Sequence, residues 1–400
     1  MANVFDYLDW RGDVAFSGAP FNEIDNLILA QLCFLDLSSI VPSDPAGACV
    51  RLEDAVDRYL ILHPLESTSM GFIVPETIPH MAIKAAKSRR FRDICVCAFV
   101  NRIDAAREEQ FSATTYLLGD GTAYVAYRGT DDTLIGWKEN FNMGFKDTIP
   151  AQADAVHYLN DVLRALPHPV RVGGHSKGGN LALYASVYAD PALRERILDV
   201  YSNDGPGFSS GILHSEEYRT IKPRVHSIVP ESSVVGMLLD HEENYQVVKS
   251  TAKGLFQHDG FSWQLIGDHF VTLESRSAES QYIDKTLKAW LSDMDDEHRE
   301  KFVDALYTVL SATNAQTLSE LNAGRKAFFA SLFTIDAETR DILWKTVLQL
   351  IAAGNKIRRE QSQSRKLQKA EAAALPEAKE KAEAKKSKPA AKKDKTNGEN

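Results

Sequence analysis

The chain has 400 residues, a formal net charge of −9 and a 44% share of hydrophobic residues, which suits a globular protein. Its four cysteines have neither the number nor the spacing of a disulfide framework or a zinc site. The absence of both a long apolar run and a basic, signal-like start argues against a membrane span and a signal peptide, so we expect a cytoplasmic protein.

The charge is unevenly distributed along the sequence. Residues 356–400 carry fourteen Lys or Arg and seven Asp or Glu, a balance of +7, which leaves −16 for residues 1–355. An acidic body argues against an enzyme that acts on nucleic acid, so we expect no nucleic-acid partner. The basic tail could contact anionic surfaces.

Residues 1–90 are predicted to form a helical segment that packs on the main domain. Apolar residues recur at intervals of three and four in residues 21–41, with Asn22 as a candidate N-cap. Two further helical patterns cover residues 50–63 and 78–91.

Residues 91–275 change to short runs rich in β-branched and aromatic residues. Runs at 92–104, 111–119 and 122–130 predict three antiparallel strands, the last two joined at Gly119-Asp120-Gly121. Strands and helices then alternate through residue 250, which predicts an α/β fold with a mixed, mainly parallel sheet covered by helices.

Residues 276–360 read as helices and predict a C-terminal helical module. From residue 361 onward the chain is Ala, Lys, Glu and Pro with little to bury, so we expect residues 361–400 to form a disordered basic tail.

Gly174-His175-Ser176-Lys177-Gly178 matches the pattern G-x-S-x-G. A strand-like run, Val170 to Val172, precedes the motif, and a helical run, Leu181 to Ala189, follows it. In this context the serine is expected on a tight strand-to-helix turn, exposed beside a helix N-terminus and backbone N–H groups. A serine needs such donors and a base to attack an acyl carbon, so we interpret Ser176 as a nucleophile.

The sequence "VGGHSKGGNLA" resembles the nucleophile elbow of α/β-hydrolases, in particular class 3 (fungal-type) lipases and a bacterial group of lipase-like proteins. Upstream, Arg128-Gly129-Thr130 resembles the lipase segment that contributes to the oxyanion hole, which implies that role for Thr130. Lipases usually have Leu where this chain has Lys177, whose side chain we expect to be exposed, although it could favour an anionic substrate. The position of the lipase acid reads Ser here, so the resemblance names no acid.

In α/β-hydrolases the acid and then the histidine follow the nucleophile along the chain. His258, in a loop after a predicted strand, is our first choice of base, and His241 and His269 remain alternatives. For the acid we favour Asp204, which follows the strand after the elbow helix, with Glu231 at the end of the next strand as the alternative.

These residues predict a serine hydrolase that cleaves a lipid-like or other acyl ester, with an oxyanion hole made by Thr130 and the Lys177 N–H. The alternatives are a thioesterase or peptidase with the same residues, or an inactive binding and scaffold protein with this fold. We expect no cofactor and no metal, since the sequence contains no motif for either. The substrate would be a small-molecule or lipid ester, and the sequence gives no oligomeric state.

Overall fold

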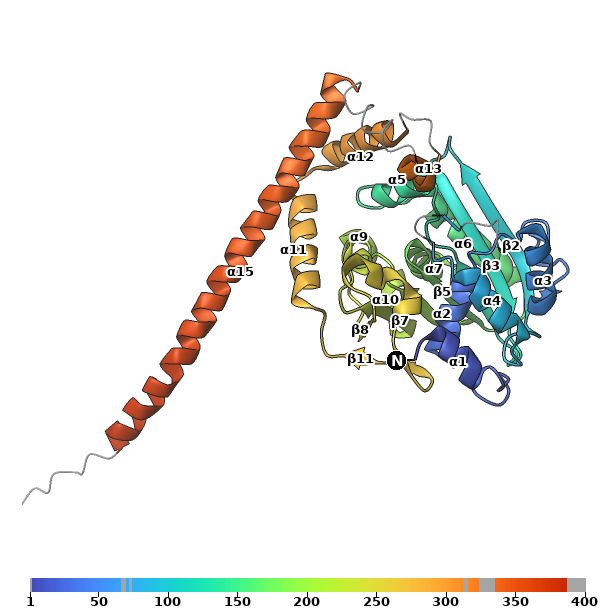
Figure 1. Ribbon diagram of the computed structural model, residues 1–400, viewed down its shortest axis with the longest axis horizontal. Helices are drawn as coiled ribbons and strands as arrows, with labels where there is room; N and C mark the ends of the chain where they lie inside the picture. Colours follow the sequence, from blue (N-terminus) through green and yellow to red (C-terminus); the bar gives the residue numbers. More distant parts are fainter. Residues whose placement is uncertain (1, 66–69, 72–73, 312–315, 324–334, 387–400) are drawn as a thin grey trace, which may run out of the picture.

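The computed structural model describes residues 2–65, 70–71, 74–311, 316–323 and 335–386. A central sheet separates two layers of helices, and one long helix projects from this body (Figure 1). In the part of the chain described, the sheet has nine strands in the order β1-β2-β3-β4-β5-β6-β7-β8-β11. These strands are β1 (Val50–Arg51), β2 (Cys95–Asp104), β3 (Glu109–Leu117), β4 (Ala123–Tyr127), β5 (Val170–His175), β6 (Ile197–Asn203), β7 (Val225–Pro230), β8 (Tyr245–Val248) and β11 (Thr272–Leu273).

The direction of the strands changes along the sheet. β1 to β4 pair in antiparallel fashion, β4 to β8 are parallel, and β11 returns antiparallel to β8 at the far edge. β9 (Leu265–Ile266) and β10 (His269–Phe270) form a separate small hairpin. The predicted α/β class, with an antiparallel meander leading into a mainly parallel sheet, is therefore confirmed.

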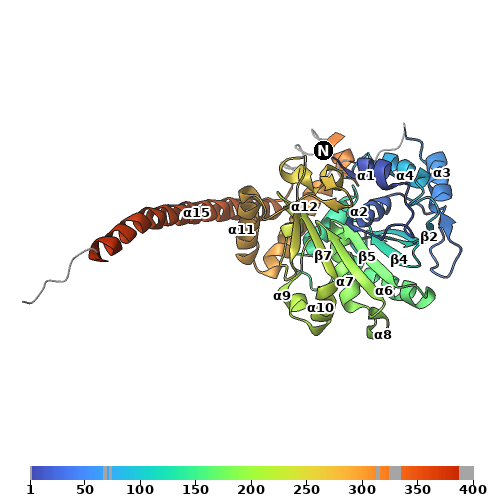
Figure 2. The same ribbon diagram turned by 90° about the horizontal axis from the view of Figure 1, so that it is seen from below.

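Helices cover both faces of the sheet (Figure 2). One face carries α1 (Val4–Arg11), α2 (Glu23–Leu32), α3 (Leu52–Leu62) and α4 (Ile78–Lys87). The other face carries α6 (Pro150–Ala165), α7 (Lys177–Tyr188), α8 (Pro191–Arg194) and α10 (Glu216–Ile221), with α9 (Ser210–Leu213) close by. A separate apolar core fills the space on each side, as expected for parallel strands buried on both faces.

The N-terminal helices are part of the body. Asn22 caps α2 as predicted, because its side chain accepts hydrogen bonds from the N–H groups of Ile24 and Asp25. Asn26, one turn into the same helix, donates to the side-chain oxygen of Asn203 on β6 over 2.9 Å. This contact ties α2 to the strand that precedes Asp204.

The C-terminal helices meet the body at α5 (Leu134–Asn142). Lys138 of α5 forms an ion pair of 2.8 Å with Asp304, and the backbone of residues 132–134 exchanges hydrogen bonds with residues 316–318. The described helices of this module are α11 (Ala278–Ser292), α12 (Asp296–Ser311), α13 (Leu318–Ala323) and α15 (Ala337–Lys386).

α15 runs past α12 and α11 and leaves the body (Figure 1). It continues to Lys386, through most of the segment for which the composition predicts disorder, while residues 387–400 lie outside the described residues. Ala, Lys and Glu are strong helix formers, and this propensity favours a helix where packing is absent. None of the described helices is long and apolar enough to cross a membrane.

Candidate active site

Ser176 lies on the turn between β5 and α7. Its backbone has φ 59° and ψ −131°, a conformation that residues other than glycine rarely adopt. Its N–H donates to the Asn203 carbonyl over 2.9 Å, and its carbonyl accepts from the Gly179 N–H over 2.9 Å. The strand, the strained serine and the helix together are the geometry of a nucleophile elbow.

The glycine of the motif at position 178 allows this turn to form against the neighbouring strand. A Cβ atom on residue 178 would lie 2.1 Å from the carbonyl oxygen of Tyr127, at the end of β4. Any side chain there would push α7 away from the sheet. The last part of G-x-S-x-G is therefore explained by close backbone packing.

His258 and Asp204 lie together at the carboxyl ends of the parallel strands. His258 ends the 3-10 helix η3 (Gly254–His258), and its Nδ1 is 2.6 Å from Oδ2 of Asp204, which follows β6. The Asp204 side chain is completely buried, whereas 20% of the His258 side chain is exposed. Because Nδ1 bonds to the carboxylate, Nε2 of the same ring remains available to take a proton from a nucleophile.

The second oxygen of Asp204 is also bonded. Its Oδ1 accepts from the hydroxyl of Ser233 over 2.5 Å and from the N–H of Gly236 over 3.2 Å. Gly236 belongs to the short 3-10 helix η2 (Val235–Met237), which packs on the sheet through Met237. The carboxylate is thus fixed in orientation before any substrate binds.

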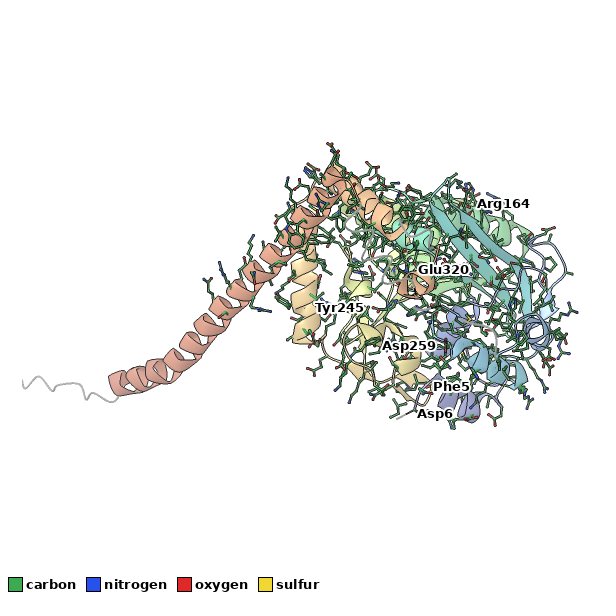
Figure 3. The ribbon with its side chains drawn as sticks, turned by 45° about the horizontal axis from the view of Figure 1, so that its top comes forward. Phe5, Asp6, Arg164, Tyr245, Asp259 and Glu320 are labelled. Atoms are coloured by element: carbon green, nitrogen blue, oxygen red, sulfur yellow. The ribbon has the colours of Figure 1, made fainter. Side chains whose placement is uncertain are left out.

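The loop that carries His258 is anchored on both sides. The Trp263 indole N–H donates to the carbonyl of Gln257 over 2.8 Å, and the Gln257 side chain accepts from the Ser232 N–H over 2.8 Å. The ring of Phe261 lies 5.8 Å from that of Phe5 in α1, in the region where Figure 3 labels Phe5 and Asp259. Contacts within the loop, with Ser232 and with Phe5 of α1 therefore hold this histidine in place.

His175, directly before the serine, contacts His258. Their ring centroids are 4.5 Å apart, and Nε2 of His175 lies 2.7 Å from the carbonyl oxygen of His258. Burial, with a smaller contribution from His258, lowers the pKa of His175 to about 3. A neutral His175 donates its Nε2–H to that carbonyl and places no charge beside the His258 ring.

The loop with Arg128-Gly129-Thr130 lies against the elbow. A Cβ atom on residue 129 would come within 2.6 Å of the His175 carbonyl oxygen and 3.2 Å of the Ser176 Cβ, so only glycine fits there. Arg128 holds the loop by donating to Asp131 over 3.0 Å. This close approach places Thr130 next to the candidate nucleophile.

Two groups near Ser176 can donate to an oxyanion. The Thr130 hydroxyl accepts from Nδ2 of Asn140 over 2.6 Å, which leaves its own hydrogen for another acceptor. Lys177 is the first residue of α7, so its N–H has no carbonyl partner within the helix. Thr130 and the Lys177 backbone N–H are therefore the candidate oxyanion donors.

The side chain of Lys177 differs from our expectation of an exposed lysine. It is buried, and its Nζ donates to the Gln110 carbonyl at 2.6 Å, the Gln110 side chain at 2.8 Å and Oε2 of Glu139 at 2.8 Å. It therefore points away from solvent and does not attract an anionic substrate. The physical reason is that Glu139 and Gln110 offer an interior site where all three ammonium hydrogens are bonded.

The structure does not bring the alternative residues into this cluster. His241 bonds to Glu243 at 2.9 Å, and His269 is largely exposed beside Asp268. Glu231, at the end of β7, is held through its backbone, since its N–H and carbonyl bond to Val248 and Ser277. Of the predicted acids and bases, Asp204 and His258 are the ones that meet.

The comparisons with known proteins address the family and the fold. A family model described as Mbeg1-like matches residues 85–308, more than half of the chain. The chain belongs to the Mbeg1-like family. The matched range contains Ser176, Asp204, His258 and Thr130, and no curated protein matches the chain.

Solved lipase structures match the chain weakly, at low identity and low TM-score. The M37 lipase is 13% identical, with 53% of this chain and 68% of that chain covered and a TM-score of 0.35. Lipase II from Rhizopus niveus is 15% identical, with 56% of this chain and 82% of that chain covered and a TM-score of 0.33. The Rhizomucor miehei lipase in its propeptide complex is 14% identical, with 57% of this chain and 68% of that chain covered and a TM-score of 0.33. The predicted relationship to a lipase-like group is confirmed by the family match.

Sequence reasoning missed several residues that support this site in the Mbeg1-like chain. They act through contacts between distant segments, and no local pattern marks Ser233, Gly236 or Glu139. His175 is the exception, because its place before the nucleophile could have drawn attention to it. These supporting residues are His175, Ser233, Gly236, Asn140 and Glu139.

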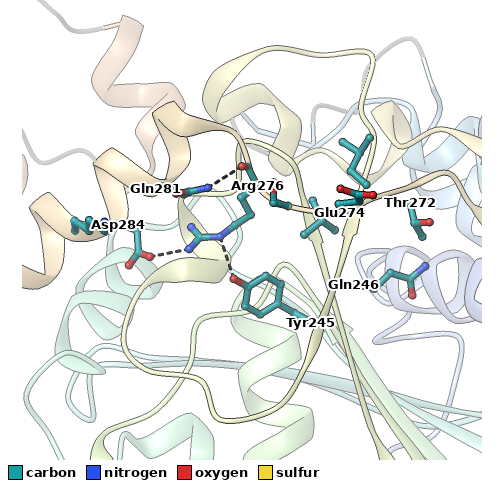
Figure 4. A pocket seen from close by; sticks show the side chains of 11 residues that line it. Tyr245, Gln246, Thr272, Glu274, Arg276, Gln281 and Asp284 are labelled. Atoms are coloured by element: carbon teal, nitrogen blue, oxygen red, sulfur yellow. Dashed lines mark hydrogen bonds and ion pairs between the residues drawn. The ribbon is translucent and has the colours of Figure 1, made fainter. Parts of the chain in front are cut away.

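A polar cavity of about 410 Å³ lies elsewhere, between β8, β11 and the start of α11 (Figure 4). Arg276 lines it and already donates to Ser280 at 3.0 Å, to Asp284 at 2.8 Å and to the Tyr245 hydroxyl at 3.4 Å. Within the described residues, no group of three or more His, Cys, Asp or Glu side chains could hold a metal ion. The cluster around Ser176 remains the candidate site.

Proposed function

We propose that the chain is a serine hydrolase that cleaves a carboxylic ester of a lipid or another acyl compound through an acyl-serine intermediate. The observation that carries this proposal is the 2.6 Å bond between His258 and the buried Asp204, formed beside the strained elbow of Ser176. The position of Asp204 supports its role as the acid that the lipase resemblance could not name, and this weighs against the alternative of an inactive scaffold.

In this mechanism His258 Nε2 takes the proton of Ser176 as the serine oxygen attacks the ester carbonyl carbon. Asp204 holds the Nδ1–H and stabilises the imidazolium that forms. The N–H of Lys177 and the N–H and hydroxyl of Thr130 donate to the oxyanion. His258 then protonates the departing alcohol, and water, activated by the same histidine, releases the acid from Ser176.

A fluorophosphonate probe tests the nucleophile, because it forms a covalent bond with an activated serine. We expect labelling of the wild type and none of Ser176→Ala. Ser186→Ala is the matched control, since Ser186 lies on the same helix, is buried and donates to the Ala182 carbonyl within it. An unlabelled wild type, or equal labelling of Ser176→Ala, would contradict the proposal.

The class of substrate needs a separate measurement. A series of p-nitrophenyl esters from acetate to palmitate, compared by kcat/KM, gives the acyl length that the site prefers. Hydrolysis of thioesters or peptides in place of every ester would favour the thioesterase or peptidase alternative, which uses the same residues.

A further inference from the structure

A buried ion pair connects the elbow to the helix that supports the Thr130 loop. Lys177 and Glu139 both have fully buried side chains, and their charged atoms are 2.8 Å apart. Lys177 is the first residue of α7, and Glu139 lies in α5. The pair therefore joins two elements that approach Ser176 from different parts of the sequence.

The hydrogen bonds around this pair are well satisfied. The three hydrogens of the Lys177 ammonium have three acceptors. Glu139 accepts from the N–H of Gln110 at 3.1 Å and from the N–H of Ala151 at 3.0 Å as well. β3, α5, α6 and α7 are thus fixed to one another at this point, with a defined geometry.

Both candidate oxyanion donors are attached to this pair. One is the backbone N–H of Lys177 itself. The other belongs to Thr130, whose hydroxyl oxygen accepts from Asn140, the residue that follows Glu139 in α5. A shift of α5 relative to α7 would therefore change the distance between the two donors.

We propose that the Lys177–Glu139 ion pair is a positioning device that sets the distance between the two oxyanion donors. This inference rests on the proposed function, because it assigns a role within the same reaction. Buried ion pairs can often be replaced by uncharged residues without loss of stability, so stability alone does not explain why charges occupy this place. A bonded pair with fixed directions restricts the geometry more than an apolar contact does.

The test separates catalysis from stability with three variants. Lys177→Met leaves the Glu139 carboxylate buried without its partner, so its thermal midpoint should fall clearly. Lys177→Met/Glu139→Gln removes both charges and retains an acceptor for a backbone N–H, so it should recover most of that midpoint. Lys138→Met is the control, because it removes the neighbouring lysine of α5, whose ion pairs are with Glu108 and Asp304 and not with Glu139.

The readout is kcat and KM for p-nitrophenyl butyrate. Loss of one oxyanion donor costs about 10²–10³ in kcat, and we expect the double variant, with donors displaced but present, to lose about 10–100-fold in kcat while KM stays close to wild type. Lys138→Met should keep the wild-type kcat. Recovery of both midpoint and kcat in the double variant would show a purely structural pair and overturn the inference.

Two further measurements cover the other outcomes. If the double variant does not fold, kcat is measured for Glu139→Gln and Asn140→Ala singly and together. A combined loss of kcat smaller than the sum of the single losses, in free energy, supports the inference that both residues act through Thr130, and fully additive losses overturn it. Fluorophosphonate labelling of the wild type is run in parallel. A labelled, active wild type with an unaffected double variant contradicts only the positioning role, whereas a wild type that neither labels nor hydrolyses esters contradicts the proposed function and this inference together.

Discussion

Two of the histidine–carboxylate pairs in the described residues, His258–Asp204 and His241–Glu243, differ in ways that show what a catalytic pair requires. His258 bonds to Asp204 at 2.6 Å and His241 to Glu243 at 2.9 Å, in both cases through Nδ1. The side chain of His258 is 20% exposed and adjoins the elbow through His175. The side chain of His241 is 8% exposed, and its Nε2 is buried with no hydrogen-bond partner among the described residues.

The carboxylates differ as much as the histidines. Besides its histidine, Asp204 accepts hydrogen bonds from Ser233 and Gly236, which lie close together in the chain. Besides its histidine, Glu243 accepts a hydrogen bond from the hydroxyl of Tyr218, a buried residue of α10. Burial alone would raise the pKa of Glu243, but the hydrogen bond and charge of His241 lower it to about 2. The second pair therefore joins α10 to residues 241–243, and a histidine bonded to a carboxylate is not by itself evidence of catalysis.

The largest expected effect separates the two histidines. His258→Ala should lower kcat for p-nitrophenyl butyrate by about 10⁴–10⁶-fold, because the serine loses its base. His241→Ala should keep kcat near the wild-type value. The kcat values and the rate of fluorophosphonate labelling check this, and a low kcat only in His241→Ala would exchange the roles of the two pairs.

The two candidate acids give the next effect. Asp204→Asn should lower kcat by about 10³–10⁴-fold, because the amide favours the wrong tautomer of His258 and does not stabilise the imidazolium. Glu231→Gln, the matched control at the end of the neighbouring strand, should leave kcat unchanged. Full activity of Asp204→Asn at neutral pH would show that the 2.6 Å bond plays no part in catalysis.

The Glu243 pair should affect stability and not catalysis. Since its folded pKa of about 2 lies below the ordinary value of 4.5, its contribution is present above about pH 4.5 and disappears as the pH falls toward 2. Glu243→Gln should lower the free energy of unfolding at pH 7 by up to about 3 kcal/mol, with kcat retained in the folded fraction.

Urea unfolding at pH 7, 5 and 3 checks this: the difference from wild type should be similar at pH 7 and pH 5 and clearly smaller at pH 3. Glu242→Gln is the control, because Glu242 is about one-third exposed and its pairing with Lys222 is a surface contact of at most about 1 kcal/mol. A difference that is independent of pH would contradict the depressed pKa.

Much of the fold could be predicted from the sequence, because local patterns determine it. Asn22 begins a helix where capping chemistry predicts one, and the alternation of strands and helices from residue 122 to 230 gives the parallel sheet. The edge strands β1 and β11 were not predicted, since two residues are too few to show a period. The first half of α15 was predicted as helix, whereas its continuation beyond residue 360 was not, because low hydrophobicity predicts disorder even where helix propensity is high.

The candidate site was less accessible to sequence reasoning. The elbow is local, so Ser176 was found from its own neighbours. The burial of Lys177 depends on Gln110 and Glu139, which are 67 and 38 residues away in sequence, so a lysine after the nucleophile looked exposed. One local feature distinguishes His241 from His258, which is the carboxylate of Glu243 two residues after His241. Only the folded structure shows that Glu243 forms a hydrogen bond with His241.

The smallest expected effect concerns His175, which supports one pair and has no counterpart in the other. His175→Phe keeps a ring against His258 but removes the N–H that bonds to its carbonyl oxygen, so kcat should fall by about threefold to tenfold, as expected for one lost hydrogen bond of about 1 kcal/mol.

The folded pKa of His175, about 3, lies below its ordinary value of 6.5, so its protonation on unfolding destabilises the wild type as the pH falls from 6.5 toward 3. This variant lacks that penalty and should lose less stability than wild type between pH 7 and pH 5 in urea unfolding. Equal losses would show that His175 takes up its proton in the folded state, and an unchanged kcat would show that His258 is held without it.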